Sequence, residues 1–159
     1  MSVDNKTEYM QEAIKKAEEN IITGKGGPFG AVVVKDGTII AAVGNRVTST
    51  NDPTAHAEVV AIREACNTLD TFDLSGCEIY ASCEPCPMCL GAIMWARIDK
   101  LYFAADRTDA ARAGFDDEIF YTELALPAEQ RSLKPTQLLQ KEANIVFDKW
   151  IETIDKIPY

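Results

Sequence analysis

A histidine–glutamate pair and a cysteine pair have the clearest chemical potential in this sequence. His56 is the chain's one histidine, and Glu58 follows it in the segment TAHAE. Thirty residues after His56, the segment PCPMC provides Cys86 and Cys89. If a helix begins at this segment, the two cysteines lie on one face of its first turn. The partial positive charge of a helix start lowers thiol pKa values and favours the thiolate form, which binds metal ions.

One imidazole and two thiolates leave one position open on a tetrahedral zinc ion. Catalytic zinc sites typically have three protein ligands and a water, whereas structural sites are usually closed by four protein ligands. Zinc can lower the pKa of that water to about 7, and a neighbouring carboxylate can move its protons. We therefore predict one zinc ion per chain, bound by His56, Cys86 and Cys89, with Glu58 as the acid/base.

Three other interpretations of these residues stay open. A lone histidine near a helix start is commonly a surface or capping residue. Cys83 extends the cysteine pair to C-x2-C-x2-C, which could begin an iron–sulfur site, but Ile93 stands where a ferredoxin pattern needs its next cysteine. Cys83 could also close a structural zinc site as fourth ligand, which would leave Glu58 and a nearby glycine-rich segment unexplained.

The order of the predicted elements favours a sheet with helices on both faces. Hydrophobic periodicity and turn residues predict a helix over 9–21, a hairpin of strands 31–34 and 38–43, a helix over 59–69, a strand over 79–82, a helix from Pro85 through Met94 or Trp95, a strand over 100–105 and a final helix over 138–151. The stretch 115–127 is ambiguous between helix and loop. This order predicts a three-layer α/β/α sandwich.

Length and composition predict one domain of ordinary globular type. The 159 residues lie within the range of about 100 to 200 residues per domain, and no repeat or linker divides them. The number of cysteines, five, is odd, which argues against a disulfide framework. Cys66 and Cys77 stand among apolar neighbours and are expected to pack in the core.

Charge and hydropathy restrict the partners and the location. Sixteen Lys and Arg oppose 25 Asp and Glu, giving a formal net charge of −9, and such a field repels phosphate backbones. No basic cluster offsets it, so we expect a small neutral ligand and no nucleic acid. No apolar stretch approaches the roughly 18 to 20 residues of a membrane span. The start of the chain shows no export signal, so we expect a cytoplasmic protein and no membrane partner.

Three residues outside the metal motif are candidates for holding a ligand. The segment GKGGPFG lacks the ending of a phosphate-binding loop, so it is either a helix cap and turn or a close backbone approach to a ligand with Phe29 as a ring face. Asn45 follows the second predicted strand, where it could read a base edge with one donor and one acceptor or simply shape a turn. Trp95 could be a core residue or part of the site.

Together, H-x-E and P-C-x-x-C form the signature of zinc-dependent nucleobase deaminases. Over nearly its whole length the chain resembles the cytidine and deoxycytidylate deaminase superfamily. The resemblance is carried by GGPFGAVVVKDG, NDPTAHAEVVAIREAC, SCEPCPMCLGAIMWAR and AADRTDAARAGFDDEIFYTEL. The first three stretches are shared across purine and tRNA deaminases, whereas AGFDD and the terminal Tyr159 resemble the small bacterial guanine deaminases.

This resemblance implies a cytidine deaminase-like fold and a reaction. Its central sheet would be mixed and five-stranded, with the fifth strand after Arg112 or in the ambiguous tail. The reaction would convert guanine and water to xanthine and ammonia in purine salvage or catabolism. Glu58 would move protons between water, ring nitrogen and leaving amine.

The resemblance also implies roles for the remaining site residues. Asn45 would read the purine edge, Phe29 would stack on the ring, Trp95 would line the cavity and Asp117 would contact the 2-amino side and assist proton transfer. Judged from the residues alone, Asp117 is an exposed residue of an acidic stretch. The C-terminal segment, about 136–159, would be exchanged within a homodimer and bring Tyr159 over the partner's site.

Two other functions stay open. A tRNA adenosine deaminase would use the same chemistry on a polymer, but the net charge of −9 counts against it, because tRNA binding needs several phosphate contacts. A non-catalytic zinc-binding interaction module would have the same metal content, but it would release no ammonia from any base.

Overall fold

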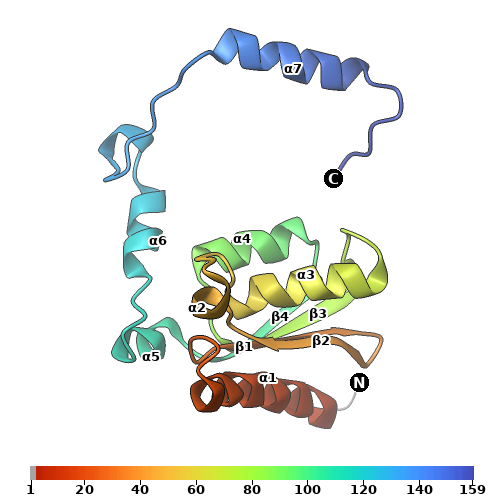
Figure 1. Cartoon of the computed structure of the whole chain (residues 1–159), viewed down its shortest axis with the longest axis vertical. Helices are drawn as coiled ribbons and strands as arrows, with labels where there is room; N and C mark the ends of the chain where they lie inside the picture. The colour runs from red at the N-terminus through yellow and green to blue at the C-terminus, as the bar shows by residue number, and fades with distance from the viewer. Residues whose placement is uncertain (1–2) are drawn as a thin grey trace. The chain divides into compact units, whose positions relative to one another are not determined.

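A mixed sheet of four strands in the order β2-β1-β3-β4 is the framework around the predicted metal ligands (Figure 1). The computed structural model describes residues 3–159. β1 (Gly30–Lys35) pairs antiparallel with β2 (Thr38–Gly44) and with β3 (Cys77–Cys83), whereas β3 and β4 (Lys100–Ala105) are parallel. β1 is buried along nearly its whole length, as its run of three valines predicts for a central strand.

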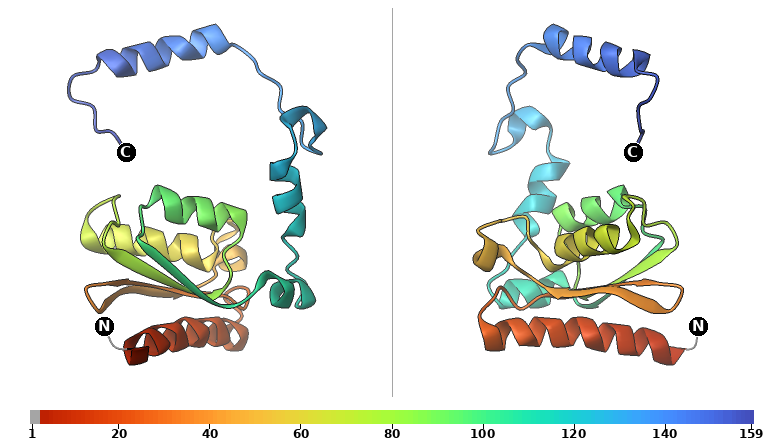
Figure 2. Two further views of the ribbon diagram at one scale, coloured as in Figure 1. Left: turned by 180° about the vertical axis from the view of Figure 1, so that it is seen from behind. Right: turned by 45° about the vertical axis from the view of Figure 1, so that its right-hand side comes forward.

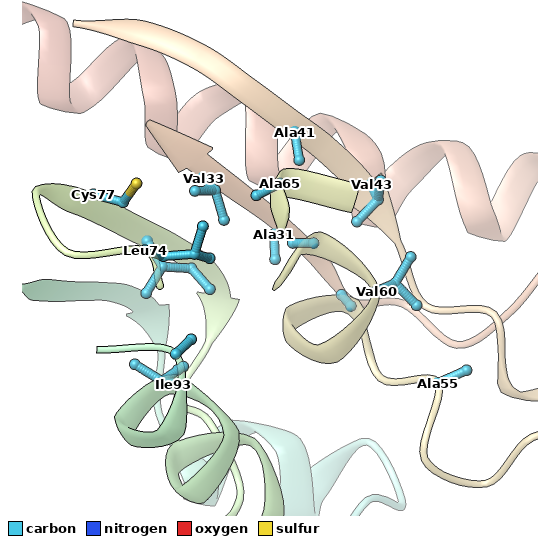
Figure 3. Packing of buried hydrophobic residues seen from close by; sticks show 14 residues of the cluster. Ala31, Val33, Ala41, Val43, Ala55, Val60, Ala65, Leu74, Cys77 and Ile93 are labelled. Atoms are coloured by element: carbon cyan, nitrogen blue, oxygen red, sulfur yellow. The ribbon is translucent and has the colours of Figure 1, made fainter. Parts of the chain in front are cut away.

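Helices cover both faces of this sheet (Figures 1 and 2). α1 (Val3–Thr23) lies on one face, where Tyr9 and Ala13 pack with Val32 and Tyr80 of the sheet. The other face carries α3 (Ala57–Leu69) and α4 (Pro87–Trp95), and the larger core cluster lies between them and the strands (Figure 3). A four-residue helix, α2 (Val47–Thr50), follows β2. The predicted α/β/α layering is therefore confirmed for this part of the chain.

The predicted fifth strand is wrong: the sheet that residues 3–159 form has four strands. The chain beyond β4 is helical instead, with α5 (Arg107–Arg112), α6 (Glu118–Ala125), a short 3-10 helix (Ala128–Gln130) and α7 (Gln140–Glu152). Aspartates are the local reason. The Asp106 side chain accepts the N–H groups of Thr108 and Asp109 and so caps α5, and Asp116 accepts the N–H of Glu118 at the start of α6.

The described chain forms two compact units, the first up to Glu118 and the second from Ile119 to Tyr159. The second unit contains the final helix, which the sequence predicts over 138–151. α7 has no buried residue, and its apolar side chains are exposed. These are Ile145, Val146, Phe147, Trp150 and Ile151. None of the described helices has the length and apolar character needed to span a membrane.

The strand directions place four loops at one edge of the sheet. Because β1 runs antiparallel to β2 and β3, its first residues pair with the last residues of both: Ala31 lies opposite Val43 and Ala81. β4 is parallel to β3, so it ends at the same edge. The loops that precede β1 and follow β2, β3 and β4 therefore emerge together. The predicted site residues of the first unit lie in these loops or in the helix starts that follow them, except Trp95 and Asp117, which lies between α5 and α6.

Candidate metal centre and substrate site

Three predicted ligands meet where α3 and α4 begin. His56 Nδ1 lies 3.4 Å from Cys89 Sγ and 3.7 Å from Cys86 Sγ. The three ligand atoms lie within 4.8 Å of one another, and among the described residues they form the one group of three or more His, Cys, Asp or Glu side chains that could hold a metal ion. The sequence motif therefore corresponds to a real cluster in space.

The helix starts position these ligands. His56 is the N-cap residue of α3 and Cys86 is the N-cap residue of α4, and neither side chain caps its own helix. Pro87 occupies the first turn of α4, where its missing N–H costs no hydrogen bond. Cys89 lies one turn further along the same helix. Both helices thus direct the partial positive charge of their free N–H groups at the cluster, which favours thiolates there.

The geometry and the donor set fit zinc. A tetrahedral zinc ion about 2.3 Å from sulfur and about 2.0 to 2.1 Å from nitrogen places these atoms about 3.5 Å apart. The observed nitrogen–sulfur distances are 3.4 and 3.7 Å. A hydrogen bond from Cys89, assisted by His56, lowers the pKa of Cys86 to about 4. The same contact raises the pKa of Cys89, so the two sulfurs hold one proton that metal binding would release.

Glu58 lies directly beside the metal cluster. It is in the first turn of α3 with 7% of its surface exposed, and its Oε2 atom lies 3.4 Å from Cys89 Sγ. Burial raises the pKa of its carboxyl group, because the charged form loses its hydration. A carboxyl group with a raised pKa can accept and return a proton near neutral pH.

Cys83 lies outside the metal cluster. Its thiol donates to the carbonyl oxygen of Asp106 over 3.7 Å, and burial raises its pKa to about 11. A thiol that keeps its proton is a poor zinc ligand. Ile93, at the position a ferredoxin pattern would need for cysteine, is a buried core residue (Figure 3). These observations favour three protein ligands over the four-ligand and iron–sulfur alternatives.

The glycine-rich loop before β1 is held against Asn45. Asn45 is 6% exposed, and its Oδ1 atom accepts the N–H groups of Val47 at 3.0 Å and Gly27 at 3.3 Å. A Cβ atom on Gly26 would lie 2.0 Å from the Asn45 carbonyl oxygen, so this position requires glycine. The sequence offers the Oδ1 and Nδ2 atoms of Asn45 as an acceptor and a donor for a base edge, and only one of the two is available. Oδ1 is already used, and the hydrogen bonds of the described residues leave Nδ2 to bind a ligand.

Phe29 brings a second loop to the site. Its ring packs edge-on against that of Phe115, with 4.8 Å between centroids and 86° between planes. Phe115 belongs to the AGFDD segment, so this contact fixes the loop that carries Asp117. Burial raises the pKa of Asp117, and the nearby charge of Cys86 raises it further. The structure thus brings Phe29, Asn45 and Asp117 to the sheet edge that holds the metal cluster.

The other two predicted site residues belong to other segments of the chain. Trp95 is the last residue of α4, and 68% of it is exposed, so it is not the core residue that it could have been. It lies at the end of the helix opposite to Cys86. Tyr159 belongs to the second unit, where its side chain is largely exposed.

Several contacts of the site were missed by sequence reasoning. Asn20 of α1 is buried and donates to two backbone carbonyls of the substrate loops. One feature of the sequence indicates its role: Asn20 is a polar residue on the helix face that Tyr9, Ala13 and Ala17 otherwise form. Glu84 accepts the backbone N–H of Arg107 and pairs with its guanidinium, which ties the cysteine loop to the start of α5. No sequence spacing indicates that pair.

Comparison with known proteins places these observations in a family. Residues 3–105 match the family described as the cytidine and deoxycytidylate deaminase zinc-binding region. The predicted zinc cofactor is confirmed by this match and by the His/Cys/Cys cluster. Guanine deaminase of Bacillus subtilis is 50% identical over 155 residues, which are 98% of this chain and 99% of that protein.

Solved structures show the same relationship. The X-ray structure of the Bacillus subtilis guanine deaminase covers 100% of this chain and 99% of its own, with a TM-score of 0.94 and 49% identity. The structure of a guanine deaminase from Nitrosomonas europaea has a TM-score of 0.65 and 39% identity, and it covers 69% of this chain and 63% of its own. The tRNA-specific adenosine deaminase of Aquifex aeolicus is 44% identical over 61% of this chain and 64% of its own length. The chain therefore belongs to the cytidine and deoxycytidylate deaminase family, as its motifs predict.

Proposed function

We propose that this chain is a zinc-dependent guanine deaminase that converts guanine and water to xanthine and ammonia. The observation that carries the proposal is the match to the Bacillus subtilis guanine deaminase, which is 50% identical and extends over 99% of that protein. The tRNA-specific adenosine deaminase of Aquifex aeolicus, by contrast, matches over 61% of this chain. The guanine enzyme thus matches a larger share of this chain, 98%, than the tRNA enzyme does.

His56, Cys86 and Cys89 would hold the metal ion. Zinc in this ligand set acts as a Lewis acid that makes water nucleophilic at neutral pH. The support for three protein ligands is the compact nitrogen–sulfur–sulfur group and the position of Cys83, whose thiol bonds to a backbone carbonyl.

Glu58 would move the protons of the reaction. It takes one proton from the attacking water as the oxygen bonds to C2 of guanine, and it passes this proton to a ring nitrogen. It then carries the second proton of that oxygen to the 2-amino group. The bond between C2 and this nitrogen breaks, ammonia leaves and C2 becomes the carbonyl carbon of xanthine. The support is the raised pKa of Glu58 and its 3.4 Å distance to Cys89 Sγ.

Four residues would hold the purine. Asn45 would donate from Nδ2 to an acceptor atom of the ring edge, and Phe29 would stack on the ring. Asp117 would contact the 2-amino side, where its raised pKa suits a group that assists proton transfer. Trp95, which is exposed at the end of α4, would line the cavity.

We further propose that the chain is a single deaminase domain that forms a homodimer in which the segment of about 136–159 is exchanged. The support is physical: α7 exposes apolar residues at helical spacing, and such a face is unfavourable in water unless a partner covers it. Exchange would bring Tyr159 over the partner's site as a lid. The cytoplasmic location stays a prediction.

Ammonia release from a panel of bases tests the proposed function. Guanine is expected to be turned over, whereas adenine, cytosine, cytidine and guanosine are not. A tRNA anticodon stem-loop, added to the same panel, tests the alternative that the chain is a tRNA adenosine deaminase. If another base is turned over and guanine is not, the proposed substrate is wrong and the proposed zinc-dependent deamination stands. Release from none of them would favour the zinc-binding interaction module.

Zinc content tests the ligand set. We expect about one zinc per chain, a loss of most of it on changing Cys86 or Cys89 to Ala, and near-normal content in Cys83→Ala. The physical reason is that removing one of three protein ligands leaves too few to retain the ion. Metal analysis after gel filtration measures this, and an equal loss in Cys83→Ala would contradict a three-ligand site.

The variant Glu58→Gln tests the acid/base. Glutamine keeps the shape and hydrogen bonding of glutamate, so fold and zinc content are expected to stay normal. Turnover of guanine should fall on the order of a hundredfold or more, because an amide cannot cycle a proton. Steady-state rates measure this, with zinc content as control. A fall of less than about tenfold would be too small for a general acid/base.

Mixed dimers test the exchange of the C-terminal segment. Deleting 157–159 should leave zinc content and secondary structure normal while turnover falls, because the site is less well closed to water. Unfolding and refolding this variant together with full-length Glu58→Gln should restore part of the activity, since one site then combines an intact Glu58 with the partner's Tyr159. A verified mixed dimer without activity would rule out that one subunit's Tyr159 completes the other subunit's site. Full activity of the truncated chain would show that Tyr159 is not part of the site.

A further inference from the structure

Asn20 links two of the loops that carry the substrate-binding residues. It lies near the end of α1, and 7% of its surface is exposed. Its Nδ2 group donates to the carbonyl oxygen of Gly27 at 3.0 Å and to that of Asn45 at 2.8 Å. Both protons of the amide are therefore used, one on each loop.

These bonds belong to a closed network around Gly27 and Asn45. Asn20 binds the carbonyl of Gly27, while Asn45 Oδ1 accepts the N–H of the same residue. The backbone N–H of Asn45 donates to the carbonyl of Phe29 at 3.0 Å, and the N–H of Phe29 donates to the carbonyl of Gly27 at 2.8 Å. The position of the Asn45 side chain is thus coupled to the backbone that Asn20 holds.

The amide of Asn20 has little room for another position. A Cβ atom on Gly44 would lie 2.6 Å from its Oδ1 atom and 2.7 Å from its Nδ2 atom, so the glycine at the end of β2 makes space for this side chain. A buried amide packed in this way has one orientation and transmits it to its partners.

We propose that Asn20 is a positioning residue for substrate recognition, which sets the orientation of Asn45 so that Nδ2 is presented to the purine. This inference rests on the proposed function, since the ligand is the base that the site deaminates. The hydrogen bonds of the Asn20 side chain go to the carbonyls of Gly27 and Asn45 and to none of the three metal ligands, so its loss is expected to weaken substrate binding and to leave metal binding intact. The proton-transfer step at Glu58 should continue once the base is bound.

Two variants of Asn20 and one matched control test this inference. Asn20→Asp keeps the shape but replaces the donor Nδ2 with an oxygen that faces two carbonyl oxygens, and Asn20→Ala removes both bonds. Tyr9→Phe is the control, because Tyr9 is buried on the same helix and its hydroxyl donates to the carbonyl of Gly37, in the hairpin turn away from the site. It removes one anchor of α1 and spares the substrate loops.

The expected result separates KM from kcat. KM for guanine should rise about tenfold in both Asn20 variants, since small displacements of binding groups are costly, while kcat changes less than about threefold and zinc content stays normal. Tyr9→Phe should leave KM within about twofold. In an Asn45→Ala background, Asn20→Ala should add less than about twofold, because residues that act through one another are not additive. Unchanged KM, full additivity or an equal rise in Tyr9→Phe would overturn the inference.

Amide hydrogen exchange provides a readout that does not depend on turnover. Exchange at Gly27, Phe29 and Asn45 should be faster in the Asn20 variants than in the wild type, and unchanged in Tyr9→Phe. Unchanged exchange would overturn the inference even if KM rose. If the wild type deaminates a base other than guanine, the proposed substrate fails and KM for that base decides about Asn20. If it deaminates none, the proposed function fails and hydrogen exchange alone decides.

Discussion

Two helix starts that meet at one point are the constraint on which the site depends. α3 begins after His56 and α4 begins after Cys86, so the free N–H groups of both helices face the same small volume. The partial positive charge of these N–H groups attracts negative groups. The thiols of Cys86 and Cys89 and the buried carboxyl of Glu58 lie in this volume. Without a cation the two sulfurs share one proton, and burial raises the pKa of Glu58, because buried charges need a partner. A zinc ion would neutralise the thiolates that the two helix starts favour, so the metal site depends on where α3 and α4 begin.

The sheet brings the substrate residues to the same place. The loops before β1 and after β2, β3 and β4 emerge at one edge, so segments far apart in sequence become neighbours. Side-chain contacts then set their geometry: Asn45 Oδ1 accepts the N–H of Gly27, and the ring of Phe115 packs against that of Phe29. In the proposed function, recognition of the base would therefore depend on groups that these contacts position, whereas the chemical step would depend on the residues at the helix starts.

The sequence was informative where spacing alone determines geometry. H-x-E and P-C-x-x-C place ligands on helix starts, and hydrophobic periodicity indicates the layers, so the metal cluster and the sandwich were predictable. The fifth strand was expected from family resemblance, and local capping by Asp106 and Asp116 produces helices there instead. Asn20 was missed because its partners lie 7 and 25 residues away along the chain. Of the two N–H groups that bind Asn45 Oδ1, that of Val47 is a local turn contact of the kind the sequence offers, whereas that of Gly27 is a tertiary contact that no sequence pattern shows.

X-ray absorption at the zinc edge of the purified protein tests the central claim, a three-ligand metal site with one open position, most directly. The account predicts two sulfur neighbours at about 2.3 Å and two nitrogen or oxygen neighbours at about 2.0 to 2.1 Å, one of them an imidazole. Addition of the substrate or product base should change the light-atom neighbours and leave both sulfurs in place. Three sulfur neighbours would show that Cys83 closes the site, and this result would contradict the account.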